Sequence, residues 1–219
     1  MILIVASRFD AEAAAFCASL GADAGDAALL LPEDLSQRGW LFDPDDVARS
    51  QAIASGRAVP CRSITGVLTL LPRVEEWELV HIVEEDRPYV AAEMTAFLLA
   101  WLAALPPSVN VINRPQAGCL AGPPWSPLRW RHEAALAGFR ISGGQSPSFA
   151  VTVAGGRALD SAGPETAARA RNLASAACVE VLSLALDAQH AFVAASSRPA
   201  LGRPGIDRTM RELLGVGKG

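Results

Sequence analysis

Short apolar runs and helical patterns alternate at the start of the chain. Ile2–Val5 is a continuous apolar run, which predicts a short strand buried on both faces. Asp10 can cap a following helix whose apolar positions 13, 16, 17 and 20 share one face. Residues 27–31 form a second apolar run that ends at Pro32. These segments predict a right-handed β-α-β unit at the start of the chain.

The middle of the chain predicts further strands and the strongest helix. Strands are expected at 40–43, 64–71 and 109–112, and a hairpin at 51–60 turns at Ser55-Gly56. After a charged loop at 84–88, apolar residues repeat at three- and four-residue spacing from Tyr89 to Leu105. A third helix is expected from the Ser126 cap to about Gly138.

The last third predicts a smaller mixed segment. Residues 142–147 resemble a linker, 149–153 alternate as a strand, and Gly155-Gly156 turns the chain into a return strand at 157–159. An alanine-rich helix is expected from Pro164 to about Asp187, then a strand at 192–195 and a helix at 206–214. The pattern therefore predicts an α/β protein in two segments, 1–141 and 148–215, which can pack as one unit.

Composition narrows the classes of function. Of the 219 residues 51% are hydrophobic and 19% charged, which argues against disorder. The net charge of −4 and the scattered basic residues argue against nucleic acid as a partner, and no apolar run could span a membrane. The start shows no secretory signal, so a cytoplasmic protein is expected. The four cysteines form no CxxC pair and are expected to be small buried side chains.

No self-sufficient catalytic motif is found in the chain. It contains no GxSxG elbow, no HExxH, no glycine-rich phosphate loop, and no glycine-rich dinucleotide fingerprint after the first strand. The only lysine is Lys218, whereas nucleotide-binding folds commonly place a lysine against phosphates.

Some polar residues nevertheless stand where an α/β fold binds ligands. Asn113 and Arg114 directly follow the strand at 109–112, and ligands bind outside the carboxyl ends of such strands. Glu93, in the long helix, could pair with Arg87 or with a group near Asn113. Arg114 and Arg198, if they converge, would suit a carboxylate or phosphate. The alternatives are a loop-stabilising asparagine, exposed arginines and a structural ion pair.

The order of these pieces resembles the ATP-grasp ligases, in particular those that modify peptides or ligate amino acids. The resemblance is carried by the residues at 86–90 followed by Glu93, by the stretch 109–115, and by the helix that closes at 134–139. It implies a Rossmann-like pre-ATP-grasp domain with a parallel or mixed sheet flanked by helices, and a small C-terminal α+β remnant of the ATP-grasp domain. Arg129 or Arg131 stands near the position of a family lysine.

The resemblance also locates two departures. After Gly144 the family has a nucleotide-clamping subdomain, whereas this chain continues directly to Phe149. At 190–199 the family carries magnesium ligands in a Glu-x-Asn-Pro type motif, and here Ala194 or Ala195 and Ser196 or Ser197 replace them. Because phosphoryl transfer depends on cations around the triphosphate, we expect neither ATP nor magnesium as a cofactor.

These observations predict a degenerate, non-catalytic ATP-grasp-like protein that acts as a partner or recognition subunit. Its expected partners are a second copy or another protein, such as a full ATP-grasp ligase, or a peptide. The alternative is a protein that binds a small carboxylate or phosphate, or a ligase component that depends on a partner. The candidate binding residues are Arg87, Glu93, Asn113, Arg114, Arg129 and Arg198.

Overall fold

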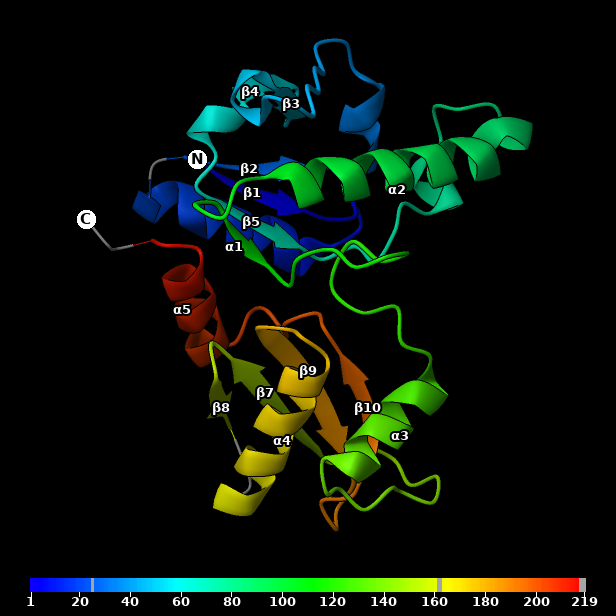
Figure 1. The fold of residues 1–219 in the computed structure, drawn as a ribbon, viewed down its shortest axis with the longest axis vertical. Coiled ribbons are helices and arrows are strands. Elements are labelled where there is room, and N and C mark those ends of the chain that lie inside the picture. The colour runs from blue at the N-terminus through cyan, green and yellow to red at the C-terminus, as the bar shows by residue number, and fades with distance from the viewer. Residues whose placement is uncertain (25, 161–162, 217–219) are drawn as a thin grey trace.

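The computed structural model describes residues 1–24, 26–160 and 163–216. Two sheets lie one above the other along the long axis of the molecule (Figure 1). The upper sheet is parallel and the lower sheet is antiparallel, and helices flank both. The predicted α/β class is therefore confirmed. Lys218 lies outside the described residues.

The upper sheet has the strand order β2-β1-β5-β6. Its strands are β1 (Ile2–Val5), β2 (Ala27–Leu30), β5 (Gly66–Thr69) and β6 (Asn110–Ile112). Leu3 and Val5 point into one core cluster, and Ile2 and Ile4 point into another on the opposite face. Both faces are buried, which explains the unbroken apolar runs in the sequence.

Two helices cover this sheet, one on each face (Figure 1). Helix α1 (Ala11–Ala24) is capped as predicted, because the Asp10 carboxylate accepts the Ala13 amide hydrogen at 3.0 Å. Helix α2 (Arg87–Ala104) buries Leu98, Trp101 and Leu102 against the other face. The charged stretch before α2 forms a 3₁₀ turn, η5 (Glu84–Asp86), in place of part of the expected loop.

A hairpin of β3 (Gln51–Ala54) and β4 (Arg57–Pro60) forms where predicted, with Ser55 and Gly56 both at positive φ. The strand expected at 40–43 was wrong: Leu41 makes only an isolated bridge to Gln51. Ring packing dominates there, since Trp40 and Phe42 both contact Phe97. Four further 3₁₀ turns occur in this half of the chain, at η1 (Pro32–Ser36), η2 (Val47–Arg49), η3 (Cys61–Ser63) and η4 (Glu76–Glu78).

The lower sheet has the order β10-β9-β7-β8. Its strands are β7 (Phe149–Ala154), β8 (Arg157–Leu159), β9 (Val181–Leu186) and β10 (Phe192–Ser196). Helices α3 (Pro127–Leu136) and α4 (Pro164–Ala176) pack on it. Helix α3 lies before the expected boundary at 141, yet Trp130 and Ala134 belong to the core of this sheet.

The long helix predicted from Pro164 to Asp187 was wrong in its second half. Helix α4 ends at Ala176, Cys178 turns the chain at φ 53°, and β9 follows. Val181 and Leu184 match the helical spacing of Leu173, but they pair as strand residues with β7, and each is buried in a hydrophobic core cluster. Strand pairing and burial outweighed the alanine-rich helical pattern.

Helix α5 (Pro204–Leu213) joins the two halves of the molecule. Ile206 and Met210 are buried in the same cluster as Phe16 of α1 and Val181 of β9. Three of the four cysteines are buried as expected, whereas Cys178 is exposed. Within the described residues, no helix is long and apolar enough to cross a membrane.

Candidate functional site

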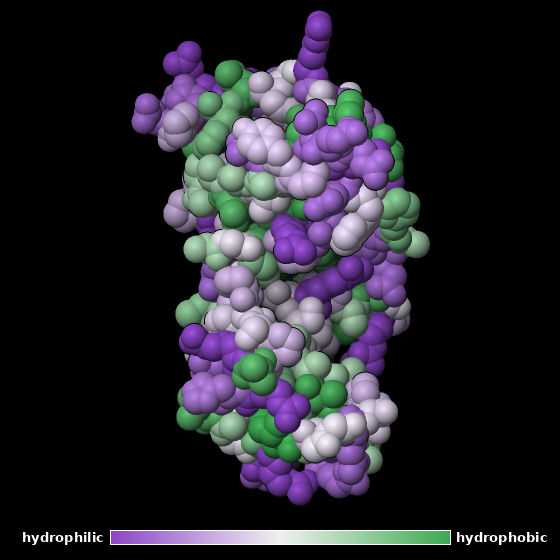
Figure 2. Space-filling model, turned by 90° about the vertical axis from the view of Figure 1, so that its right-hand side faces the viewer, coloured by the Kyte–Doolittle hydropathy of each residue, from purple (hydrophilic) through white to green (hydrophobic). Residues whose placement is uncertain are grey.

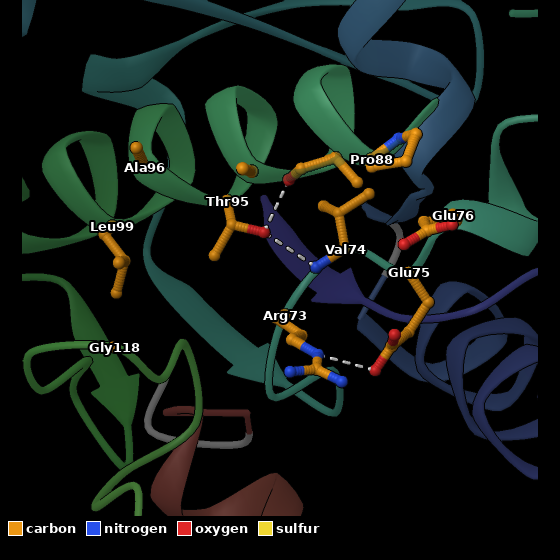
Figure 3. Close-up of a pocket in the computed structure, with 11 residues that line it drawn as sticks. Arg73, Val74, Glu75, Glu76, Pro88, Thr95, Ala96, Leu99 and Gly118 are labelled. Carbon is orange, nitrogen blue, oxygen red and sulfur yellow. Dashed lines mark hydrogen bonds and ion pairs between the residues drawn. The ribbon is translucent and has the colours of Figure 1, made fainter. Parts of the chain in front are cut away.

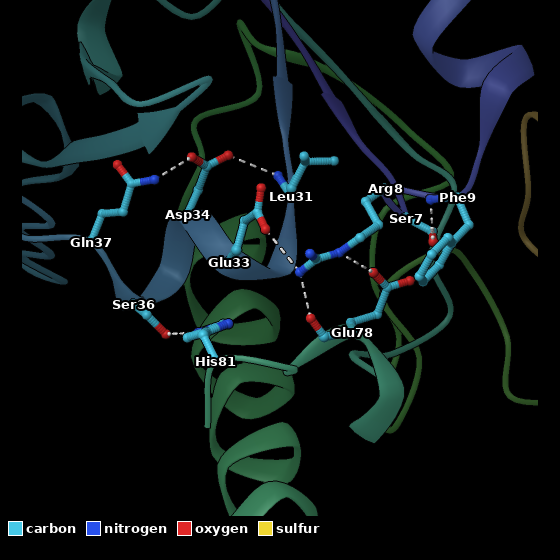
Figure 4. Close-up of polar contacts among 10 residues, drawn as sticks. All are labelled: Ser7, Arg8, Phe9, Leu31, Glu33, Asp34, Ser36, Gln37, Glu78 and His81. Atoms are coloured by element: carbon cyan, nitrogen blue, oxygen red, sulfur yellow. Dashed lines mark hydrogen bonds and ion pairs between the residues drawn. The ribbon is translucent and has the colours of Figure 1, made fainter. Parts of the chain in front are cut away.

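Three charged side chains meet at the carboxyl edge of the parallel sheet (Figure 4). Arg8 follows β1, Glu33 follows β2, and Glu78 lies beyond β5. The Arg8 Nη2 atom is 2.8 Å from Glu33 Oε2 and donates a hydrogen bond of 2.6 Å to the Glu78 carbonyl oxygen. Carboxyl ends of parallel strands share one edge of a sheet, where α/β folds bind ligands.

Glu78 is almost fully buried, with 1% of its surface exposed. Arg8 Nε lies 3.7 Å from Glu78 Oε2, and neither of these buried atoms has a hydrogen-bond partner in the described structure. The two charges therefore compensate each other without a direct hydrogen bond. The contact fixes the turn after β1 against η4.

A second set of contacts ties the end of β2 to the hairpin. The Asp34 carboxylate accepts hydrogen bonds from the backbone amides of Leu31, Ser55 and Gly56 at 3.0, 3.3 and 3.2 Å. His81 Nε2 lies 2.8 Å from the Ser36 hydroxyl oxygen. These contacts stabilise loop structure around the edge.

A cavity of about 410 Å³ lies beside this edge, between the segment after β5 and α2 (Figure 3). Arg73 Nε donates to Glu75 Oε1 at 2.9 Å, and this hydrogen bond raises the pKa of the arginine above its ordinary value. Thr95 fixes the opposite wall, since its hydroxyl accepts the Val74 amide hydrogen at 3.0 Å. With Glu76 also in the lining, the cavity has two carboxylates and one guanidinium, a poor match for an anion.

Exposed apolar side chains lie close to the cavity in sequence. We call Trp77, Val80, Val83 and Tyr89 the aromatic rim, and each is at least 60% exposed. Trp77 follows Glu76, and Tyr89 follows Pro88, both in the cavity lining. Figure 2 views the side toward which the first turn of α2 points, and shows hydrophobic residues interspersed with strongly hydrophilic ones. Exposed aromatic residues of this kind are typical anchors of protein interfaces.

Asn113, a predicted site residue, connects the two sheets. It is 3% exposed and has a φ of 51°. Its Nδ2 donates to the carbonyl oxygens of Val181 at 2.8 Å and Ser197 at 2.7 Å. Its Oδ1 accepts from the amides of Glu180 and Val181, both at 2.9 Å. The side chain thus uses its hydrogen-bonding capacity inside the protein.

Arg114 and Arg198 do not converge on one ligand. The Arg114 guanidinium donates to three carbonyl oxygens at and beyond the end of α2, each at 3.2 Å. Arg198 Nη2 lies 2.7 Å from the Asp10 carboxylate, next to α1. The two arginines therefore bind different groups, and the structure offers no shared carboxylate or phosphate site between them.

The other three predicted residues also lie apart. Arg129 pairs with Glu133 at 2.9 Å and lies over the ring of Trp125. Arg87 Nε donates to the Ile82 carbonyl oxygen at 3.0 Å. Glu93 contacts neither Arg87 nor Asn113, and no hydrogen bond or ion pair joins its carboxylate to another described residue. The six candidates thus do not form a single site.

Arg8, Arg73 and Glu78 were not among the predicted site residues. Arg8 lies three residues beyond Val5, the last residue of the first buried strand, so its position near a strand end was a signal of the same kind as that of Asn113. Glu78 gave no such signal, because its contact with Arg8 spans 70 positions of the chain.

The end of β10 does not fit magnesium. The side chains of Ala194 and Ala195 have no atom that can ligate a metal. The Ser196 hydroxyl accepts the Arg198 amide hydrogen at 3.1 Å. The Ser197 carbonyl oxygen accepts from Asn113. Within the described residues, no group of three His, Cys, Asp or Glu side chains is arranged to hold a metal ion.

The fold is similar to that of solved ATP-grasp peptide ligases. PsnB in complex with a minimal precursor matches with a TM-score of 0.69 and 9% identity, over 100% of this chain and 98% of that chain. The macrocyclase MdnC of Microcystis aeruginosa MRC, bound to the precursor peptide MdnA, matches with a TM-score of 0.69 and 10% identity, over 97% and 98%. The macrocyclase MdnB of the same organism has a TM-score of 0.60, 10% identity and coverage of 100% and 99%.

No protein-family model and no curated protein sequence matches the chain. The structural matches extend over nearly the whole of both chains, so they do not by themselves support the loss of a central subdomain. At this low identity the similarity concerns the fold, which is the ATP-grasp-like α/β fold of these peptide ligases.

Proposed function

We propose that the chain is a recognition or partner protein with an ATP-grasp-like fold, which binds a peptide or another protein and does not ligate it alone. The observation that carries this proposal is the fold of peptide ligases combined with uncharged side chains at the end of β10. The resemblance in sequence puts the metal ligands of a ligase at that place. The partner is a peptide, a second copy of this chain or a different protein.

The roles of the residues around β10 support this proposal. Arg198 forms an ion pair with Asp10, and Ser197 accepts a hydrogen bond from Asn113. These contacts join the two halves of the molecule, so the Arg198 guanidinium and the Ser197 carbonyl oxygen are engaged with the protein itself. A magnesium-bound triphosphate would require carboxylate and cationic side chains that point into an open site.

The connection between α3 and β7 gives further support. Ser142 donates its amide hydrogen to the Phe192 carbonyl oxygen at 2.9 Å, and Ser148 donates to Leu186 at 2.8 Å. The connection is only the stretch 137–148, and it is held against β10 in its middle and against β9 at its end. The family resemblance puts a nucleotide-clamping subdomain at this connection, and so short a segment supports its loss from this chain.

The aromatic rim is the surface that we propose for the partner. Trp77 is 60% exposed and Tyr89 is 70% exposed, and each adjoins in sequence a residue that lines the cavity of about 410 Å³. Aromatic side chains at a rim of this kind can bury a large area with little loss of conformational entropy. A peptide chain with apolar anchors would fit this surface.

Two measurements test the proposal. The purified chain, with MgATP and peptides from an array, is expected to release no phosphate and to form no ligated product. Peptides that bind the wild type are expected to bind the Trp77→Ala variant at least about tenfold more weakly, as for the loss of an interface anchor. Leu128→Ala is the matched control, since Leu128 is 79% exposed on α3, away from the rim, and this variant should bind as the wild type does.

Either of two results would overturn the proposal. The first is ATP-dependent ligation that is abolished by a single substitution in this chain. The second is an array in which no peptide binds, together with a monomer in solution that gains no partner at high concentration.

A further inference from the structure

A second cavity lies on the opposite side of α2 from the first. It has a volume of about 310 Å³ and is lined by Leu35, Trp40, Glu93, Met94 and Phe97. Glu93 and Phe97 are four residues apart on α2, so they lie on one face of the helix. Its size is at the lower end of the range for small-molecule sites.

Two aromatic rings form perpendicular walls of this cavity. The rings of Trp40 and Phe97 have centroids 5.2 Å apart and planes at 84°. Trp40 also packs edge-on against the buried Trp101, with centroids 5.6 Å apart. Its indole Nε1 donates to the Asp34 carbonyl oxygen at 2.8 Å. The indole is therefore fixed before any ligand arrives, while part of it and of Phe97 remains exposed.

Glu93 supplies the only charge in the lining. Its side chain is exposed, and none of the described residues forms an ion pair or hydrogen bond with its carboxylate. Arg87, the nearest arginine along the helix, is bound to the Ile82 carbonyl oxygen and does not line the cavity. The cavity thus combines aromatic surface with one uncompensated negative charge.

We propose that this cavity binds an alkylammonium group. Aromatic rings attract a cation through their electron-rich faces, most strongly when the cation is partly desolvated. The aliphatic surface of Leu35 and Met94 suits the carbon atoms of such a group, and the Glu93 carboxylate balances its charge. A carboxylate or phosphate would be repelled by Glu93, and a neutral apolar group would desolvate this carboxylate without compensation.

The inference is independent of the proposed function, because it concerns a different cavity and requires no peptide. The cation can come from a free quaternary amine or from a lysine side chain of a peptide. Choline and Nα-acetyl-lysine amide, whose side-chain ammonium group is free, are the two probes that separate these sources. The neutral isostere of choline, 3,3-dimethylbutan-1-ol, tests whether the positive charge matters.

The experiment is an NMR titration that follows the indole Nε1–H signal of Trp40, assigned with Trp40→Phe. Choline or Nα-acetyl-lysine amide is expected to shift this signal in a saturable way, and the neutral isostere is expected to bind at least about fivefold more weakly. Glu93→Gln should lower the affinity for the cation about fivefold, which corresponds to the free energy of one partly exposed ion pair. Because the Glu93 carboxylate forms no hydrogen bond or ion pair with the described residues, this variant should fold normally.

Glu85→Gln is the matched control, since Glu85 is also exposed but lies in η5 outside the cavity. It should bind the cation as the wild type does. Phe97→Leu keeps an apolar wall and removes a ring. It should therefore lower the affinity for the cation more than the affinity for the neutral isostere. The proposal is wrong if neither cation gives a saturable shift, if the isostere binds equally well, or if Glu93→Gln has no effect.

Discussion

Replacement of Asn113 by alanine should weaken the contact between the two halves of the molecule and destabilise the fold. The side chain is buried and makes four hydrogen bonds, all to backbone groups at the start of β9 and just beyond β10. Asn113→Ala removes these bonds and leaves two amides and two carbonyl oxygens to find other partners. It also places alanine at a φ of 51°, which an L-residue without a polar side chain rarely adopts.

The magnitude follows from these two contributions. A net value of about 1 kcal/mol for each hydrogen bond gives roughly 4 kcal/mol, less whatever water recovers at the site. The left-handed backbone adds about 1 kcal/mol. We therefore expect Asn113→Ala to lower the free energy of unfolding by about 3–5 kcal/mol.

Two other substitutions at this position distinguish the loss of hydrogen bonds from the cost of the left-handed backbone. Asn113→Gly loses the same hydrogen bonds but tolerates the positive φ, so it should be less destabilised than Asn113→Ala. Asn113→Asp keeps the shape but puts an oxygen against the carbonyl oxygens of Val181 and Ser197. It should be destabilised about as much as the alanine variant.

Urea denaturation followed by tryptophan fluorescence and circular dichroism measures these differences. Asn172→Ala is the control, since Asn172 is exposed on α4 and its replacement should change stability by less than about 0.5 kcal/mol. A loss of less than about 1 kcal/mol in Asn113→Ala would show that the two sheets are held together by other contacts.

Three further predictions concern single side chains. In the folded protein, a thiol reagent should label Cys178 rapidly and the other three cysteines slowly, because burial raises the pKa of those three thiols; equal labelling of all four would contradict the burial. Hydrogen bonds from the Ala191 amide and its neighbours lower the pKa of Asp187, so this carboxylate stabilises the fold above its ordinary pKa of 3.8 and loses that effect as pH falls below it. Asp187→Asn should therefore lower the melting temperature at pH 7 and flatten its dependence between pH 4 and 2, as measured by calorimetry. Arg114→Lys should cost about 1 kcal/mol, because one ammonium cannot span three carbonyl oxygens, and hydrogen exchange should rise at the end of α2.

Local signals predicted much of the fold. The apolar run at Ile2–Val5, the Asp10 cap and the Ser126-Pro127 helix start each depend on neighbouring residues, and all appear in the structure. The boundary between α4 and β9 could not be found in this way. Cys178 takes a positive φ without the glycine that usually marks such a turn, and β9 forms because it pairs with β7 far away in sequence.

The candidate site shows the same limit more strongly. Asn113 was found because it follows a strand, but its partners lie 67–84 positions away and gave no pattern in the sequence. Glu93 was a candidate binding residue with a structural ion pair as the alternative, and only the packing of Trp40 against α2 shows that it lines an aromatic cavity. The charge on each residue could be predicted, whereas the group that it faces depends on the tertiary structure.

The packing of α5 against α1 has a consequence for the way the protein is made. Ile2, Ile4 and Phe16 leave the ribosome long before Ile206 and Met210, which complete their common core. During synthesis this apolar face of the first sheet therefore stays only partly covered, by α1, until α5 has emerged. Nascent chains cut short before α5 should therefore aggregate or be held by chaperones, however complete their first sheet is.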